Sequence, residues 1–457
     1  RIDVIDPSTE RVITSVADAS VEEGIAAIDA AQGAAAGWAA TPPRKRAEVL
    51  MKAFSIMMER AETIAQLISR ENGKALPDAR GEVAYAAEFF RWYAEEAVRN
   101  VGEISVAPAG NNRIIVQYQP IGIALLVTPW NFPAAMVTRK IGPALAAGCT
   151  CILKPATETP LTAYAIAEIL AEAGVPAGVV NVVTTSTSGK LVGAMLKDSR
   201  VRKLSFTGST EVGRVLLREA AEGIISCSME LGGNAPFVVF EDADIDAAVE
   251  GAMIAKMRNG GEACTAANRF YVHRKAVAEF SEKFAARMKA LKLGAGYDKD
   301  TQLGPLINKK SRDDVAALVD DAISKGARLV VGGKALDGKG FFYEATVLAD
   351  VPDDAAMLSE EIFGPVAPVV TFDTEDDAIT LANSTEYGLV AYVYTRDLAR
   401  GLRVSERIEA GMVALNRGLV SDAAAPFGGV KQSGLGREGS HHGMHEFCEI
   451  KYIATSW

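Results

Sequence analysis

The chain has 457 residues, of which 49% are hydrophobic, and a formal net charge of −10. This length exceeds what one hydrophobic core usually supports, so two or three domains are expected. The acidic balance, without a basic run or tail, argues against nucleic acids and anionic membrane surfaces as partners. Small molecules are therefore the favoured substrates.

The cysteines indicate the compartment. They stand at positions 149, 151, 227, 264 and 448, an odd number with wide spacing. Such spacing does not match a disulfide framework and is typical of a reducing compartment. The sequence contains neither an apolar run of membrane-spanning length nor an N-terminal stretch like a signal peptide. We therefore expect a cytoplasmic protein with no membrane partner.

The first hundred residues predict helices. Apolar residues recur at intervals of three and four over 21–99, and Asn72-Gly73 is a stop signal within that stretch. Short apolar runs then alternate with helical segments; these runs are "IGIALLVTPW", "CTCILKPA", "GVVNVVT" and "VRKLSFTG". The alternation predicts a parallel sheet covered by helices.

The second half repeats this arrangement. Its predicted strands are "APFVVFED", "RFYVHR", "ARLVVGG", "VAPVVTF" and "VAYVYT", and its predicted helices are 244–256, 276–291 and 310–325. Two α/β domains follow, with a seam near Glu230. The alternating runs "RIIVQYQ" and "EIKYIATSW" have no helical neighbour, so they predict a third, small β element that pairs with another subunit.

One cysteine lies in a setting that favours reactivity. In "NGGEACTAANRF", residues 259–270, Cys264 is surrounded by glycine, alanine and small polar residues. A core cysteine usually has bulky apolar neighbours, whereas an accessible thiol near backbone amides can have a pKa below its free value. The flanks of Cys264 therefore favour a reactive thiol.

A strand, a glycine turn and a helix follow one another in "SFTGSTEVG". Gly208 and Gly213 frame the start of a helix from Thr210, and backbone amides at such a start suit a pyrophosphate. An ordinary strand-to-helix turn is the alternative. The run "GLGREG", residues 434–439, matches G-x-G-x-x-G, but no strand leads into it, so we interpret it as a coincidental match.

Polar residues stand at the ends of other predicted strands. Glu230 in "MELGGN" suits a general base, although a solvated loop acid is the alternative. Asn131 in "TPWNFPAAM" is an amide donor in a turn stiffened by prolines, and Lys154 in "KPA" adds a cation. Because open α/β sheets bind ligands at the carboxyl ends of their strands, these residues predict one site.

The C-terminal run "HHGMHEFC" offers His441, His445 and Cys448 on one helical face. Such a trio can hold zinc, but no fourth ligand stands nearby and a solvated face is the more common arrangement. We predict no metal site.

Together these stretches resemble the NAD(P)-dependent aldehyde dehydrogenase superfamily over essentially the whole chain. The resemblance is carried, in order, by "PWNFP", "KPA", "FTGSTEVG", "ELGGN", "GGEAC", "EEIFGPV" and "PFGGVKQSG". It implies a cofactor-binding domain at 1–103 and 121–229, a catalytic domain at 230–437 and an oligomerisation element at 104–120 and 438–457. It also implies a homodimer or homotetramer.

The same resemblance implies roles for single residues. Cys264 would be the nucleophile, Asn131 and the Cys264 amide would bind the oxyanion, and Glu230 would activate water for thioester hydrolysis. The implied cofactor-binding residues are Thr128, Pro129, Trp130, Lys154, Thr157, Phe206, Thr207, Gly208, Ser209, Val212, Leu231, Glu361 and Phe363.

Three residues indicate the substrate. Arg139, Arg258 and Ser421 match positions that grip the distal carboxylate in relatives acting on succinate semialdehyde, and guanidinium groups suit a planar carboxylate. Glutarate semialdehyde carries the same carboxylate and is the near alternative. A catalytically silent scaffold of this fold and a coenzyme A-acylating enzyme are further alternatives.

The sequence also indicates which cofactor is preferred, and at two positions near Cys264 it differs from the residues usual in the family. Thr157 is small and neutral where relatives restricted to NAD often carry a glutamate, so NADP is the expected cofactor and NAD is possible, with Glu158 next door as a contrary sign. Glu262 replaces the usual glutamine, and we expect its side chain to point outward, because a carboxylate facing the thiol would raise the thiol pKa. Ala266 replaces a second cysteine, so no local disulfide switch is expected. Arg417 could reshape the pocket wall.

Overall fold

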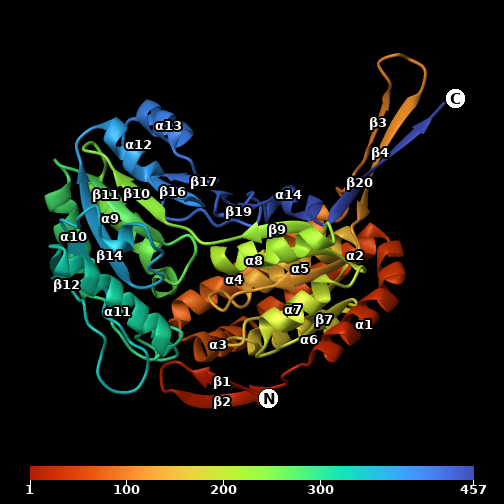
Figure 1. Ribbon diagram of the computed structural model, residues 1–457, viewed down its shortest axis with the longest axis horizontal. Helices are drawn as coiled ribbons and strands as arrows, with labels where there is room; N and C mark the ends of the chain where they lie inside the picture. Colours follow the sequence, from red (N-terminus) through yellow and green to blue (C-terminus); the bar gives the residue numbers. More distant parts are fainter. Residues whose placement is uncertain (457) are drawn as a thin grey trace.

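The fold of the computed structural model is built around two sheets, each covered by helices on both faces (Figure 1). The structure describes residues 1–456. Within that part of the chain, no helix is both long and apolar enough to cross a membrane.

The first sheet has six strands. In sheet order they are β19 (Gly434–Leu435), β9 (Ser226–Glu230), β8 (Val201–Thr207), β5 (Ile123–Val127), β6 (Thr150–Lys154) and β7 (Val180–Val182). All neighbours are parallel except β19, which pairs antiparallel with β9. This edge strand comes from the C-terminal part of the chain, within the segment expected to belong to the second domain.

Helices cover both faces of the first sheet. One face carries α1 (Val21–Ala40), α7 (Ser188–Leu196) and α8 (Thr210–Glu222). The other carries α5 (Ala135–Ala147) and α6 (Leu161–Ala173), with α2 (Pro43–Glu59), α3 (Ala61–Asn72) and α4 (Leu76–Glu96) packed behind them. Strand β5, "IALLV", shows why helices cover both faces, because successive side chains of a strand point to opposite faces of the sheet. Leu125 packs in the core on the side of α1, α7 and α8, and Leu126 packs in the core on the side of α5 and α6.

The second sheet has seven strands. In sheet order they are β12 (Arg328–Val331), β13 (Thr346–Ala349), β14 (Val366–Phe372), β11 (Ala267–His273), β10 (Ala235–Val239), β16 (Val390–Tyr394) and β17 (Met412–Leu415). Only the edge strand β12 is antiparallel to its neighbour. One face packs against α9 (Ile245–Met257) and α10 (Val277–Lys289), the other against α11 (Lys309–Ser324), α12 (Glu375–Asn383) and α13 (Leu398–Arg407).

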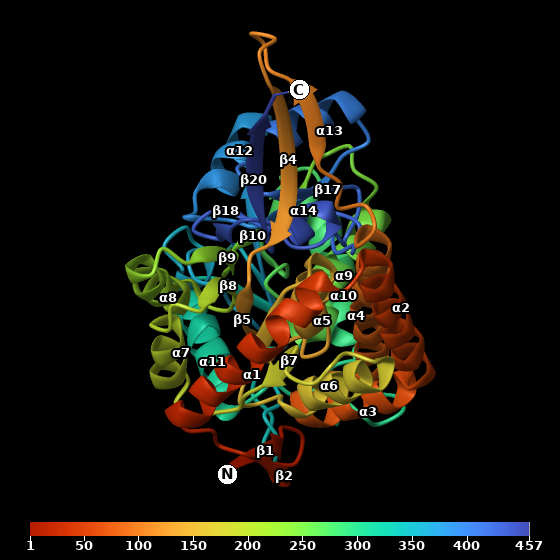
Figure 2. The same cartoon turned by 90° about the vertical axis from the view of Figure 1, so that its right-hand side faces the viewer.

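Three smaller sheets lie outside these layers. A three-stranded sheet of β3 (Glu103–Val106), β4 (Arg113–Pro120) and β20 (Cys448–Thr455) projects from the body, and the hairpin of β1 (Ile2–Asp6) and β2 (Arg11–Val16) lies at the opposite end (Figure 2). The remaining short elements are η1 (Arg258–Gly261), η2 (Ala356–Leu358), β15 (Tyr387–Gly388), β18 (Val430–Lys431) and α14 (Ser440–His445).

The predicted α/β class with two doubly wound parallel sheets is confirmed, as are the helices of the first hundred residues. The two alternating runs form strands of one small sheet, as expected, and they pair with each other as β4 and β20. Trp457, the end of the predicted C-terminal strand, lies outside the described residues. The sequence reading did not identify the N-terminal hairpin. Its turn is held by the Asp6 side chain, which accepts hydrogen bonds from the Ser8 amide at 2.8 Å and the Thr9 hydroxyl at 2.9 Å.

Candidate active site

The turn before Cys264 has an uncommon backbone. Asn259, Gly260 and Gly261 all have positive φ angles of 52°, 61° and 85°. A Cβ atom on Gly261 would lie 2.2 Å from the carbonyl oxygen of Gly364, so only glycine fits there. The turn therefore presses against the Gly364 segment and leads directly to Cys264 ahead of β11.

The Cys264 thiol is only partly exposed, and burial raises its pKa to about 12. Arg139 and Arg258 favour the thiolate, while the carboxyl groups of Glu361 and Glu230 oppose it when ionised, which places these four side chains near the sulfur. In this state of the protein, Cys264 therefore does not have the lowered pKa that an accessible thiol near backbone amides can have. Enclosure by the fold costs the thiolate its hydration.

Asn131 is buried beside this turn, at the end of the segment that follows β5. Its Nδ2 donates to the Glu262 carbonyl at 3.1 Å, and its own carbonyl accepts from Lys74 Nζ at 2.7 Å and Asn259 Nδ2 at 2.9 Å. An amide nitrogen carries two hydrogens, so one remains for a ligand. The bonds to its main chain hold Asn131 in place.

Glu230 is the last residue of β9, opposite Thr207 of β8 and Gly434 of β19. Its carboxyl is buried, and neither oxygen has a hydrogen-bond partner within residues 1–456. Burial first, and then the charge of Glu438, raise the pKa of Glu230 well above its ordinary value. Burial therefore favours the protonated form of Glu230.

Glu438 stands behind Glu230 and was not singled out from the sequence. It forms buried ion pairs with Lys140, at 2.5 Å, and with Arg139. Burial opposes its ionisation, but Arg139 and Lys140 outweigh burial and lower its pKa. Its position inside "GLGREG", read as a coincidental phosphate motif, concealed it; a lone carboxylate in a glycine-rich loop was the only available signal.

The β8–α8 turn faces the same region. The Gly208 amide donates to the Glu230 carbonyl at 3.1 Å, and Ser209 caps α8 by accepting from the Val212 amide at 3.4 Å. The Thr207 hydroxyl is buried without a partner in the described chain. Phe206 and Leu231 are buried in the core beneath this turn.

The other predicted cofactor residues lie on both sheets. The Thr128 amide, just before Pro129, donates to the carbonyl of Lys154 at 3.2 Å, and burial lowers the pKa of Lys154. Thr157 lines a cavity of about 230 Å³ together with Glu158.

Contacts of two aromatic rings and of one carboxyl group link the parts of the chain that belong to the two sheets. Trp130, from the first sheet, meets Phe363 edge to face at 5.4 Å between ring centroids. Glu361, two residues before Phe363, accepts from the Gly233 amide at 3.3 Å, and burial raises its pKa to about 7. A Cβ atom on Gly233 would lie 2.7 Å from the Cys264 carbonyl oxygen. This close approach brings the segment that follows Glu230 against the loop that carries Cys264, residues 259–264, which we call the thiol loop.

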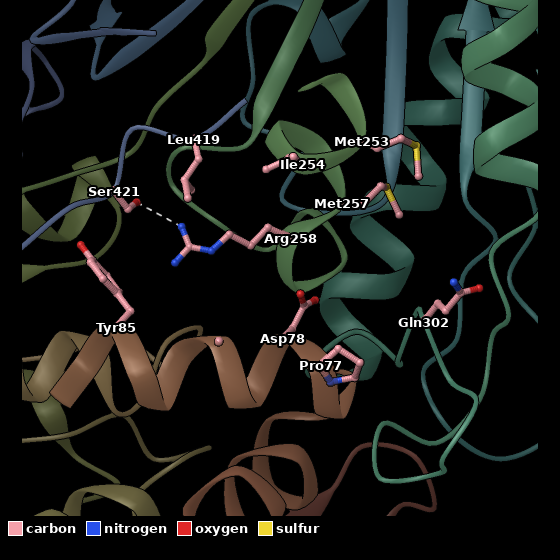
Figure 3. Close-up of a pocket in the computed structure, with 11 residues that line it drawn as sticks. Pro77, Asp78, Tyr85, Met253, Ile254, Met257, Arg258, Gln302, Leu419 and Ser421 are labelled. Atoms are coloured by element: carbon pink, nitrogen blue, oxygen red, sulfur yellow. Dashed lines mark hydrogen bonds between the residues drawn. The ribbon is translucent and has the colours of Figure 1, made fainter. Parts of the chain in front are cut away.

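A cavity of about 420 Å³ opens beside the thiol loop (Figure 3). Arg258 and Ser421 both line it, and the guanidinium donates to the Ser421 hydroxyl at 3.1 Å. Arg258 also lies over the rings of Phe132, at 4.7 Å, and Tyr85, at 5.6 Å. The remaining lining residues are Pro77, Asp78, Gly81, Met253, Ile254, Met257, Gln302 and Leu419.

Arg139 does not line this cavity. Its guanidinium is buried, paired with Glu438 and placed 4.3 Å from the ring centroid of Phe427. Of the three residues expected to bind a carboxylate, the structure thus brings Arg258 and Ser421 together in the cavity and holds Arg139 behind it. Arg417 is exposed and is not among the lining residues.

The expectation that Glu262 points outward is wrong. Its side chain is 2% exposed, and its Oε1 accepts from the Ile307 amide at 3.0 Å. Burial raises the pKa of Glu262 to about 8. The tight turn at 259–261 directs this side chain into the interior, where a backbone amide distant in sequence provides its partner.

The C-terminal histidines are spread over different contacts. His445 stacks on Tyr118 of β4 with ring centroids 4.5 Å apart, and the Cys448 thiol donates to the Met444 carbonyl at 3.5 Å. Among the described residues, no three histidine, cysteine or acidic side chains are grouped as metal ligands.

Comparison with known proteins gives the family. The aldehyde dehydrogenase family matches residues 1–453. The chain is 58% identical over 445 residues to a succinate-semialdehyde dehydrogenase of Paenarthrobacter nicotinovorans, covering 97% of this chain and 99% of that protein. It is 50% identical over 455 residues to a glutarate-semialdehyde dehydrogenase of Pseudomonas putida, covering 100% and 94%.

The solved structures agree with these matches. The crystal structure of an NADP-dependent enzyme of Escherichia coli superposes with a TM-score of 0.98 at 49% identity and covers 100% of this chain and 95% of that one. The chain belongs to the aldehyde dehydrogenase family.

Proposed function

We propose that this protein oxidises succinate semialdehyde to succinate, with NADP⁺ as the preferred acceptor and NAD⁺ as the second. The observation that carries the proposal is the Arg258–Ser421 pair, which presents a guanidinium and a hydroxyl inside a cavity beside the thiol loop. A cation in the wall of a substrate cavity favours an anionic substrate group. The similarity to a succinate-semialdehyde dehydrogenase supports the same choice.

The residues present fit a nicotinamide dinucleotide. The Thr207 hydroxyl, which has no partner in the described chain, the capped start of α8, and Lys154 at the end of β6 offer donors to phosphate and ribose groups. Thr128, Pro129, Phe206, Gly208, Val212 and Leu231 complete the proposed lining. Glu361, Phe363 and Trp130 would hold the nicotinamide end, and Thr157 leaves space for a 2′-phosphate. When bound, the cofactor supplies the hydride acceptor.

The chemistry of the chain begins at Cys264. Its thiol loses a proton, and the sulfur forms a bond to the aldehyde carbon while the carbonyl oxygen gains negative charge. The second Nδ2 hydrogen of Asn131 and the Cys264 amide stabilise that oxyanion. After oxidation the acyl group remains on the sulfur as a thioester.

Glu230 releases the product. Once deprotonated, it accepts a proton from water, whose oxygen attacks the thioester carbon and expels the Cys264 thiolate. Because burial raises the pKa of Glu230, we expect hydrolysis to accelerate as the pH rises.

The distal carboxylate of the substrate would contact Arg258 and Ser421 directly. Arg139 was expected to share this contact, but its charge is already met by Glu438. We therefore propose that Arg139 acts at longer range, through the positive charge that it adds near Cys264.

Glutarate semialdehyde is a second candidate, since it carries the same carboxylate on a longer chain. Met253 and Met257 in the cavity wall favour it, because the flexible thioether side chain adapts to ligands of different length. The similarity to a glutarate-semialdehyde dehydrogenase points the same way.

We further propose a homodimer or homotetramer that assembles through the projecting β3–β4–β20 sheet. Its exposed apolar side chains include Ile104 and Ile450, at 68% and 67% exposure. These side chains lie on β3 and β20, the two edge strands of the sheet, and an exposed apolar edge strand suits pairing with a second copy. We propose the cytoplasm as the compartment, because a free-thiol nucleophile needs reducing surroundings.

A substrate comparison tests the function. We expect reduced cofactor to form from succinate semialdehyde with NADP⁺ and without coenzyme A, and butanal, the uncharged four-carbon analogue, to react at least about 100-fold less well in kcat/KM. The Arg258→Met variant should lose most of this preference. Equal rates with both aldehydes would contradict the substrate, a requirement for coenzyme A would contradict hydrolysis, and stronger turnover with NAD⁺ at equal concentration would contradict the cofactor.

A further inference from the structure

A carboxylate faces the candidate carboxylate-binding residues from across the cavity. Asp78 stands in the first turn of α4 and points toward the turn that carries Arg258 (Figure 3). Its Oδ2 accepts from the Asn259 amide at 2.9 Å, the residue directly after Arg258. Asp78 therefore holds the backbone of the turn and contributes to the cavity wall.

The groups around Asp78 have opposite effects on the pKa of its carboxyl group. Burial raises its pKa, and Glu82 adds to this effect, whereas the Asn259 amide, Lys74 and Arg258 lower it. Lys74 is already engaged by Glu82 at 2.5 Å and by the Asn131 carbonyl. Arg258 is the cation that shares the cavity with Asp78, although the two do not form a close ion pair.

We propose that Asp78 is a specificity-determining residue that weakens the attraction of Arg258 for anionic substrate groups and so limits how tightly carboxylated ligands bind. The proposal rests on the proposed function, because it assumes that a carboxylate occupies the space beside Arg258. A carboxylate there experiences the charge of Arg258 and, with opposite sign, that of Asp78. The product carries two carboxylates, so a weaker attraction aids its release.

Two variants of Asp78 distinguish the effect of its negative charge from the effect of its hydrogen bond to the Asn259 amide. Asp78→Asn keeps an oxygen that accepts from the Asn259 amide and removes only the negative charge. Asp78→Ala removes both and leaves that amide without its partner. Glu95→Gln, an exposed acid on the same helix, controls for the loss of one charge.

We expect Asp78→Asn to lower KM for succinate semialdehyde and the inhibition constant of succinate by about three- to tenfold at pH 8, because a nearby opposing charge is gone. KM for butanal and kcat for both aldehydes should change by less than about twofold. Glu95→Gln should match the parent protein. Asp78→Ala should lower kcat for both aldehydes, since the turn before Cys264 loses its anchor.

The pH profile distinguishes a charge effect from a change of shape. As the pH falls and Asp78 becomes protonated, the ratio of parent to Asp78→Asn KM should fall toward one, because both side chains are then neutral. A ratio that is independent of pH, or an equal change for butanal, overturns the proposal. If the parent protein shows no preference for carboxylated aldehydes, the proposed function fails first; if that preference exists but Asp78→Asn leaves it unchanged, only this inference fails.

Discussion

At the residue scale, burial favours the protonated forms of the two groups proposed for catalysis. Burial raises the pKa values of both Cys264 and Glu230 and so opposes formation of the thiolate and of the carboxylate. A raised pKa at a buried carboxyl suits a base that acts late in a reaction, after the first step has changed the charges around it. This assignment makes the two steps of the proposed reaction separable by mutation.

Glu230→Gln should separate acylation from hydrolysis. We expect a rapid burst of reduced cofactor, about one equivalent per site, followed by a steady rate lower by about 10²–10⁴-fold, because water is no longer activated. Mass spectrometry of the stopped reaction should show the acyl group on the peptide containing Cys264. Cys264→Ser, the control, should give neither burst nor adduct, and full steady turnover of Glu230→Gln would contradict the role of Glu230.

Glu262 predicts a pH dependence of stability. Its pKa is about 8 in the folded protein and near the ordinary value of 4.5 when unfolded, so between these pH values the folded state binds the extra proton. The free energy of unfolding should therefore fall as the pH rises from 5 toward 9.

Glu262→Gln should lose part of this decline, because an amide does not titrate yet still accepts from the Ile307 amide. Denaturant unfolding at pH 5.5, 7 and 8.5 measures the difference between the two proteins. Parallel pH profiles would show that Glu262 does not titrate in this range.

At the element scale, a carboxylate from one helix stabilises the start of another. Glu71, near the end of α3, accepts from the Leu161 and Thr162 amides at 2.8 and 2.9 Å and also from the Thr162 hydroxyl. These amides open α6, whose N-cap, Pro160, supplies no side-chain hydrogen bond. The contact joins segments about ninety residues apart, so periodicity could not reveal it.

Glu71→Ala should reduce the free energy of unfolding by about 1–3 kcal/mol, because buried donors at the start of α6 lose their acceptor. Glu71→Gln should recover much of that loss through its carbonyl oxygen. Urea denaturation of the three proteins at pH 6 gives the comparison. No change in the alanine variant would mean that water replaces the carboxylate at this helix start.

At the scale of the whole molecule, the candidate site lies where the two sheets meet. Glu230 ends β9 of the first sheet, and five residues later β10 begins the second. Asn131 comes from the first sheet and Cys264 from the turn before β11 of the second, and they are joined through the Glu262 carbonyl and Asn259. Small shifts between the two sheets would therefore change the geometry of the site.

The projecting sheet predicts how copies assemble. Ile450→Glu should weaken the proposed homo-oligomer, because a charge would be buried in the interface, and sedimentation should show smaller species at micromolar concentration. Leu398→Glu, a change at an equally exposed leucine on α13, should keep the assembly of the parent protein. Identical sedimentation of all three proteins would place the interface elsewhere.

The sequence by itself determined the family, the fold class and the strands that carry the candidate site. These follow from short-range signals: hydrophobic period, turn residues, and polar side chains at strand ends. The domain bounds and the roles of individual site residues stay predictions.

Only the tertiary structure decided the charge states and pairings. The pairing of Arg139 with Glu438, the buried side chain of Glu262 and the raised pKa of Cys264 all arise from contacts between residues distant in the chain. The local sequence indicates whether a residue is of a type that can react. The burial that sets its pKa, and the partner that it meets, depend on how the two sheets pack together.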